Sequence, residues 1–179
     1  MLKHDYLCRD GELNGRTLTV ACVPFDVAAP VSDDGLTVYL EAFDRGAFAA
    51  VTRAPNRTVL RREHSHDEAL TVAKQLTEEP DTLIGVFDVG HSEDADRLLE
   101  DWNAGEFGGV SLGFVPGDHV GDNEIVDGVT RRRRVKSLRE VSFVKDPAFA
   151  STGVLAIRSD AARRAAIERE HWHWLTLRA

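Results

Sequence analysis

Alternating apolar and polar positions run through most of the chain and predict a protein built mainly from β-strands. The predicted strands share this alternation and an abundance of β-branched residues, and they cover 16–25, 36–40, 58–66, 70–76, 82–89, 111–115, 133–144 and 154–157. The runs 70–76 and 82–89 flank Glu78-Glu79-Pro80-Asp81 and are expected to form a hairpin. The stretch 116–128, rich in Gly and Asp, is expected to be a loop.

Helical spacing of apolar positions occurs in two places. The clearer helix begins at Ser92 or Asp94, either of which can cap it, and ends at Gly105. A shorter helix is predicted over 41–51, where Phe43, Ala47, Phe48 and Val51 recur on one face. Strong helix formers also fill the tail, so we expect a domain over 1–158 and a C-terminal helical extension over 159–179.

Many strands and few helices favour an α+β fold that is mostly β. The chain has 179 residues, 42% of them hydrophobic, which is enough for one domain with a substantial core. We therefore predict a single domain with a closed or partly closed antiparallel β-barrel core and a few helices packed outside it.

The charge balance limits the classes of partner. A net charge of −8 argues against a surface that coats nucleic acid, and the run Arg131 to Arg134 is interpreted as a solvated hairpin or sheet edge. The chain has two cysteines, Cys8 and Cys22, and its first residues lack the apolar segment of a signal peptide. No apolar run approaches membrane-spanning length. These features predict a protein of the reducing cytoplasm, with neither nucleic acid nor membrane as a partner.

Ser111 is the first candidate for chemistry, because it lies between Gly109 and Gly113 in the sequence Gly-Val-Ser-Leu-Gly. This matches the nucleophile elbow of α/β-hydrolases, which requires a strand before the serine and a helix after it. Here the predicted order is reversed, with a helix before Ser111 and a strand after it. The motif therefore predicts a serine at the start of a strand, where the two glycines would leave room for a substrate backbone.

Two histidines offer a base or a metal site. Period-two geometry along 58–66 places His64 and His66 on one side of the predicted strand. With Asp67 and His91 they suggest a zinc site, although the pattern lacks a fixed third ligand. Alternatively, His64 or His66 takes the proton of Ser111, and Glu140, in the middle of a half-apolar strand, orients the imidazole.

Five segments of the chain occur in an order that links these candidates. They are Gly15 to Phe25, Tyr39-Leu-Glu-Ala-Phe-Asp-Arg-Gly-Ala-Phe48, Leu60-Arg-Arg-Glu-His64, Ser111-Leu-Gly-Phe114 and Leu138-Arg-Glu-Val-Ser-Phe-Val-Lys-Asp-Pro-Ala148. In type and order they resemble the tailed-phage prohead proteases, capsid-maturation serine proteases related in fold to the herpesvirus assemblins. The resemblance implies a herpesvirus-protease-like fold.

The resemblance also implies roles for three residues: Ser111 as nucleophile, His64 as base and Glu140 as the acid that orients it. The family usually has His-Asp at the end of the histidine strand, whereas this chain has His64-Ser65-His66-Asp67, so either histidine fits. The spacing from Leu60 and to Leu70 favours His64. Thr71 stands where a glycine is common in the family.

The implied activity is that of a serine endopeptidase without a cofactor or metal. Its expected substrates are scaffold or major capsid protein segments and the protease itself, and it would act inside the assembling prohead in the host cytoplasm, where it could also self-associate. Two alternatives stay open: a non-catalytic assembly or scaffold factor with the same fold, and a metal-dependent hydrolase that uses His64 and His66.

Overall fold

The computed structural model describes residues 16–32, 36–67, 69–149 and 151–159. Cys8 and residues 160–179 of the predicted C-terminal helical extension lie outside this part of the chain, whereas Ser159 is the last residue of a strand. The described elements are β1 (Arg16–Pro24), β2 (Ala29–Val31), β3 (Tyr39–Phe43), η1 (Val51–Arg53), η2 (Pro55–Arg57), β4 (Val59–Arg62), β5 (Ala69–Glu78), β6 (Thr82–Asp88), α1 (Glu93–Ala104), β7 (Gly109–Pro116), β8 (Asn123–Val126), β9 (Val129–Arg132), β10 (Val135–Val144) and β11 (Gly153–Ser159).

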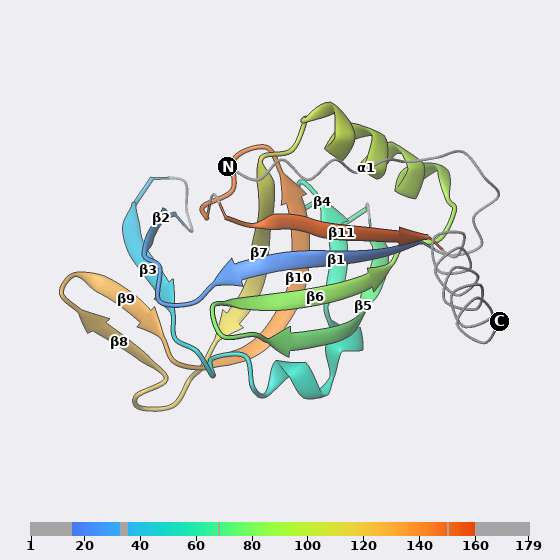
Figure 1. Cartoon of the computed structure of the whole chain (residues 1–179). Coiled ribbons are helices and arrows are strands. Elements are labelled where there is room, and N and C mark those ends of the chain that lie inside the picture. Colours follow the sequence, from blue (N-terminus) through green and yellow to red (C-terminus); the bar gives the residue numbers. More distant parts are fainter. Residues whose placement is uncertain (1–15, 33–35, 68, 150, 160–179) are drawn as a thin grey trace, which may run out of the picture.

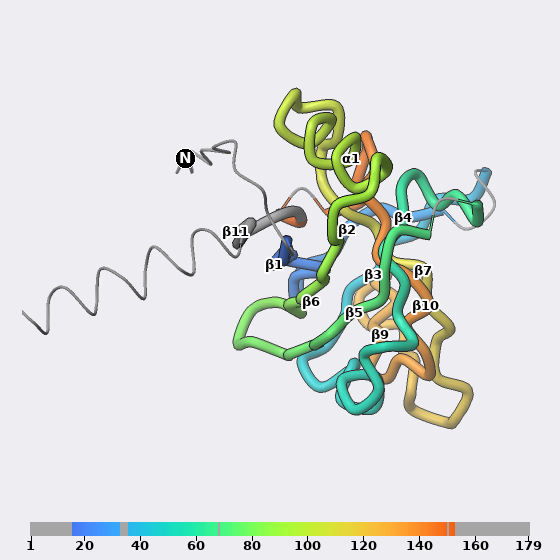
Figure 2. The backbone as a smooth tube through the Cα atoms, turned by 90° about the vertical axis from the view of Figure 1, so that its right-hand side faces the viewer, coloured from blue at the N-terminus to red at the C-terminus, as the bar shows by residue number. Residues whose placement is uncertain are grey.

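The strands form two sheets (Figure 1). One has seven strands in the order β11-β1-β6-β5-β4-β10-β7, and the other has four in the order β2-β3-β9-β8. Neighbours are antiparallel except β4 with β10 and β3 with β9. In both views α1 lies at one end of the curled large sheet and the β8-β9 hairpin lies at the other (Figures 1 and 2).

The prediction of a mostly β single domain is confirmed, but the barrel is not closed. The large sheet curls into a half-barrel whose end strands, β7 and β11, are not paired with each other. The other four described strands, β2, β3, β9 and β8, pair among themselves in the small sheet. A single parallel bridge between Phe25 and Phe43 connects the two sheets. Within the described residues there is also one α-helix rather than several, beside two short 3₁₀ turns.

The core lies inside the curl of the large sheet. Strand β6 alternates buried and half-buried residues along its length, as expected for a strand with one face against a core. The largest fully buried side chains are Phe43, Phe48, Phe87, Phe143, Leu18, Leu60, Leu83, Leu98 and Leu138. The predicted hairpin and the predicted strands 16–25 and 133–144 correspond to β5-β6, β1 and β10.

The predicted helix over 92–105 is confirmed as α1. The Ser92 hydroxyl accepts a hydrogen bond from the Ala95 N–H at 3.2 Å, which caps the first turn. Gly105 ends the helix in the left-handed conformation, with φ of 78°. The helix packs Leu98 and Leu99 into the core. No helix within the described ranges is long and apolar enough to cross a membrane.

The predicted helix over 41–51 is wrong. Glu41 lies in β3, opposite Ala29 of β2 and Thr130 of β9, and a turn follows from Asp44. The apolar residues that suggested a helix are buried, but they reach the core from a strand, a turn and η1. Pairing with two neighbouring strands therefore overrides the local helical spacing. The strand predicted over 36–40 is displaced toward the C-terminus, because β3 begins at Tyr39 and continues to Phe43.

The prediction of a loop over 116–128 is also wrong in part, because it contains β8, which forms a hairpin with β9. The arginine run lies at this hairpin, as expected, but β9 is an internal strand rather than a sheet edge. Arg131 forms ion pairs with Asp26 and Asp44, and these carboxylates raise the pKa of its guanidinium. The positive run is therefore largely neutralised within the fold.

The buried thiol of Cys22 provides a test of the core. Burial raises its pKa to about 12, so the thiolate is nearly absent near pH 8. We expect iodoacetamide at pH 8 to alkylate Cys22 roughly a thousandfold more slowly in the folded protein than in urea. Mass spectrometry of the Cys22 peptide measures both rates separately from Cys8. Equal rates would contradict the described core.

Candidate active site

A cleft of about 480 Å³ opens between the two sheets. Its apolar wall comes from β3, β7 and the segment after β10, and includes Phe43, Leu112, Phe114 and Phe149. Ser111 and His64 line the same cleft. The structure thus brings two of the three candidates, 47 positions apart in the sequence, to one hollow.

Ser111 lies near the beginning of β7, after α1, in the order that the sequence predicts. Strand β7 is the end strand of the large sheet, and Ser111 lies opposite Ser142 of β10. Thr152 anchors the preceding residue: its hydroxyl accepts from the Val110 N–H at 3.0 Å and lies 2.9 Å from the Val110 carbonyl oxygen. These contacts fix the backbone from which Ser111 projects.

His64 occupies a tight turn after β4. Strand β4 ends at Arg62, and both Glu63 and His64 have positive φ, 47° and 57°. Left-handed backbone at two consecutive non-glycine residues costs roughly 1–2 kcal/mol each. Two hydrogen bonds hold the start of this turn. The Glu63 N–H donates to the Phe143 carbonyl on β10, and the Glu63 carboxylate accepts from the N–H of Lys145, which follows β10. The predicted strand 58–66, with both histidines on one side, is therefore wrong after Arg62.

Glu140 lies in the middle of β10, between β4 and β7. Its Oε1 lies 2.5 Å from His64 Nδ1 and accepts from the Ser142 hydroxyl at 3.3 Å. The carboxylate side chain is only 11% exposed. Because the carboxylate is an acceptor, His64 carries its proton on Nδ1, and Nε2 is left able to accept a proton. The sequence-based pairing of Glu140 with a histidine thus corresponds to a direct contact.

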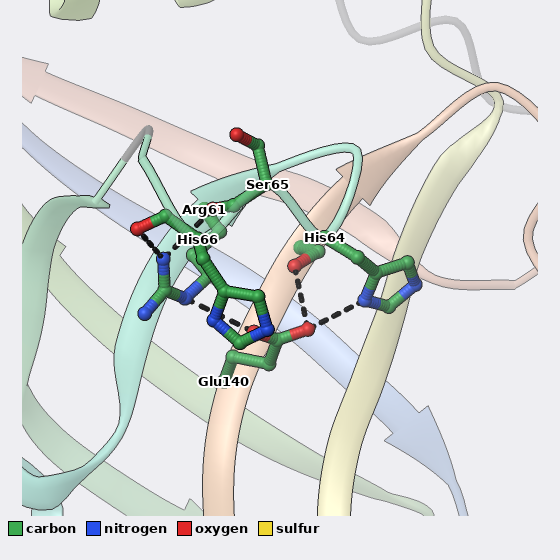
Figure 3. Close-up of polar contacts among 6 residues, drawn as sticks. Arg61, His64, Ser65, His66 and Glu140 are labelled. Carbon is green, nitrogen blue, oxygen red and sulfur yellow. Dashed lines mark hydrogen bonds and ion pairs between the residues drawn. The ribbon is translucent and has the colours of Figure 1, made fainter.

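The other histidines are arranged differently. His66 is exposed, and its main-chain carbonyl accepts a hydrogen bond from Arg61 at 2.8 Å (Figure 3). The contacts of the Glu140 carboxylate are to His64, Arg61 and Ser142. Among the residues that the structure describes, no three or more His, Cys, Asp or Glu side chains are placed to hold a metal ion. The geometry therefore favours His64 over His66 as the partner of Glu140.

Ser111 and His64 share the cleft without a hydrogen bond between them in the described structure. Such contacts between nucleophile and base are often long before substrate binds. A serine, a histidine with a free Nε2 and a carboxylate on Nδ1 can together perform acyl transfer, provided that Nε2 reaches the serine hydroxyl.

The two glycines that flank Ser111 have a role that the sequence interpretation missed. A Cβ on Gly113 would lie 2.5 Å from Glu140 Cγ and 2.9 Å from its Oε1. A Cβ on Gly109 would lie 2.6 Å from the Thr152 hydroxyl. The space beside these glycines is filled by the chain's own residues rather than left for a substrate backbone. In the Ser-Leu-Gly-Phe segment, glycine is required so that Glu140 can lie across β7.

Two polar residues of the site also went unrecognised, Arg61 and Ser142, which both contact Glu140. The sequence signal for them was their position close to a candidate, Arg61 three residues before His64 and Ser142 two residues after Glu140. Nothing in a single sequence shows, however, that β4 and β10 are neighbours. That parallel pairing joins residues 59–62 to 140–143.

Comparison with known families places the chain among viral proteins. The model of the family described as caudovirus prohead serine protease matches residues 28–166. The match includes all three candidate residues. No curated protein matches the chain.

Replacement of Gly113 tests the packing beneath Glu140. In Gly113→Ala the new methyl group must displace the Glu140 side chain, at a cost of about 1–3 kcal/mol in the free energy of unfolding. We expect this loss in urea denaturation, together with loss of the contact between His64 and Glu140 in histidine ¹⁵N NMR spectra. Gly121→Ala is the control, because it meets no atom within 4 Å and introduces only left-handed strain, with φ of 86°. An unchanged His64 signal in Gly113→Ala would contradict the proposed packing.

Proposed function

Since the chain belongs to the caudovirus prohead serine proteases, we propose that it is a serine endopeptidase whose triad is Ser111, His64 and Glu140. The family supports a role in capsid maturation. The roles of the three residues rest on the site itself. The observation that carries them is the contact of 2.5 Å between His64 Nδ1 and Glu140, on the wall of the cleft that Ser111 also lines.

In the proposed reaction the Ser111 hydroxyl attacks the scissile carbonyl carbon, and His64 Nε2 accepts its proton. The tetrahedral intermediate then collapses: the carbon–nitrogen bond breaks, and His64 donates the proton to the leaving amine. Water then attacks the acyl carbon, and His64 accepts its proton. His64 returns the proton to Ser111 as the acyl group is released as a carboxylic acid. Glu140 keeps the imidazole in the required tautomer and stabilises the imidazolium that forms.

The proposed substrates are segments of the scaffold or of the major capsid protein, and the protease itself. The cleft supports a peptide substrate, because it is open and combines an apolar wall with polar groups near Ser111. We place the reaction inside the assembling prohead, in the host cytoplasm. We also propose a catalytic domain over 1–158 and a C-terminal extension over 159–179 that serves in docking to the shell or in self-cleavage.

Ser111→Ala tests the protease function. Removal of the nucleophile is expected to reduce cleavage by at least about a thousandfold, because a triad acts as a unit. The variant is co-expressed with the major capsid protein of the same phage, and products are followed by gel electrophoresis and mass spectrometry. Ser137→Ala, on β10 but outside the cleft lining, is the control and should cleave normally.

Undiminished cleavage by Ser111→Ala would overturn the proposal. If that cleavage also stopped on chelation, the metal-dependent alternative would replace it. If neither wild type nor variant cleaved capsid, scaffold or protease, the non-catalytic assembly factor would be favoured.

A comparison of His64→Ala with His66→Ala tests the choice of base. His64→Ala is expected to lose roughly as much activity as Ser111→Ala, because both steps of proton transfer need its ring. His66→Ala should keep most of its activity, since Arg61 contacts only the main-chain carbonyl of His66. The same co-expression assay measures both variants. The reverse pattern would assign the base to His66.

A further inference from the structure

We propose that Arg61 is a positioning residue of this site, which holds the acid and the segment carrying the base in one fixed arrangement. The inference rests on the proposed function, because it concerns how His64 and Glu140 stay aligned. Arg61 does not line the cleft, so it acts through these two residues rather than on substrate.

Arg61 contacts both sides of the pair with one guanidinium (Figure 3). Its Nη1 donates to the carbonyl oxygens of Ser65 and His66, at 2.7 and 2.8 Å. Its Nε lies 3.0 Å from Glu140 Oε2 and forms an ion pair with it, although the geometry of this contact is not that of a hydrogen bond. The first two contacts hold the chain just after His64, and the third holds the carboxylate that His64 contacts.

The strand arrangement makes this double contact available. Strand β4 runs parallel to β10, with Val59 opposite Glu140 and Arg61 opposite Ser142. Arg61 therefore lies beside Glu140 and only three residues before His64, at the point where the chain turns back. A planar guanidinium can reach a carboxylate and two carbonyls at once, whereas an ammonium group is a point charge without that fork.

The turn that carries His64 needs a second anchor. The hydrogen bonds of Glu63 to Phe143 and Lys145 fix the residues before His64. The residues after it are held through Arg61 and through one hydrogen bond from the Ser65 N–H to the Arg62 carbonyl. His64 itself is 46% exposed, so packing alone does not restrain its ring. Release of the Ser65–His66 side would let the strained backbone relax and turn the imidazole.

The charge of Glu140 gives a second reason why Arg61 is needed in this site. Glu140 is only 11% exposed, and its negative charge needs a cation when His64 is neutral, as it must be to act as a base. Arg61, itself 15% exposed, is that cation. Arg61 pairs with Oε2 of the carboxylate, so Oε1 is left to contact His64. Without Arg61, the carboxylate is expected to turn toward solvent, and the imidazole would lose its orienting partner.

The experiment compares Arg61→Gln, Arg61→Lys and Arg62→Gln in the full chain, with diisopropyl fluorophosphate as the probe. In this reaction a bond forms between Ser111 Oγ and phosphorus, fluoride leaves, and the serine proton passes to His64. Arg62→Gln is the matched control on the same strand, because Arg62 pairs instead with Asp101 of α1 at 2.5 Å. Circular dichroism and urea denaturation record the folding of each variant.

Arg61→Gln is expected to lower the limiting rate of phosphorylation by about tenfold to a hundredfold, with the half-saturating probe concentration within about twofold of wild type. Arg61→Lys should recover part of this loss, since it restores the charge but not the fork. In ¹⁵N-histidine NMR spectra we expect a His64 Nδ1 proton signal in the wild type, and we expect this signal to broaden or vanish in Arg61→Gln. Arg62→Gln should keep the rate and the signal even where it lowers stability.

A wild-type rate and NMR signal in Arg61→Gln would overturn the inference, as would equal losses in Arg61→Gln and Arg62→Gln. If Arg61→Gln does not fold, Arg61→Lys is the variant that tests the inference. A wild-type rate in Arg61→Lys would show that the planar guanidinium is not required, and would overturn the inference. Failure of the proposed function is distinguishable: Ser111→Ala would then react with the probe as fast as wild type.

Discussion

The contact between Glu140 and His64 is the interaction on which the site depends, and much of the surrounding structure serves it. It joins residues 76 positions apart, at a distance of 2.5 Å. The parallel pairing of β4 with β10 brings them together, the left-handed turn at Glu63 and His64 aims the ring, and Gly113 leaves space for the carboxylate. Arg61 and Ser142 occupy the remaining sides of the carboxylate.

This arrangement explains why the site is built on an open half-barrel. Ser111 lies on the end strand of the large sheet, so among the described strands none extends the sheet beyond β7, and the small sheet forms another wall of the cleft. The peptide substrate that we propose would need such access. A closed barrel would have covered the edge on which Ser111 lies.

The sequence predicted what local patterns encode. The α1 helix, the β5-β6 hairpin and the strand that begins near Ser111 follow from periodicity and caps, and the three candidate residues came from segment order. Two of the failures share one cause, whereas the loop predicted over 116–128 failed because it contains part of a local hairpin, β8-β9. The helix predicted over 41–51 and the strand continued through His66 were both decided by partners distant in the chain, through β3 pairing with β9 and through Glu63 bonding to Phe143. Arg61 and Gly113 were missed because their function is defined only by contact with Glu140.

In the proposed triad Glu140 acts only through His64, and a double-mutant cycle tests this most directly. The rate of Ser111 phosphorylation by diisopropyl fluorophosphate is measured in His64→Ala, Glu140→Gln and the double variant. If Glu140 serves to orient His64, the double variant reacts as slowly as His64→Ala and no more slowly, because an orienting group has no effect without its base. If the two losses multiply instead, Glu140 acts independently of His64, and the proposed triad is wrong.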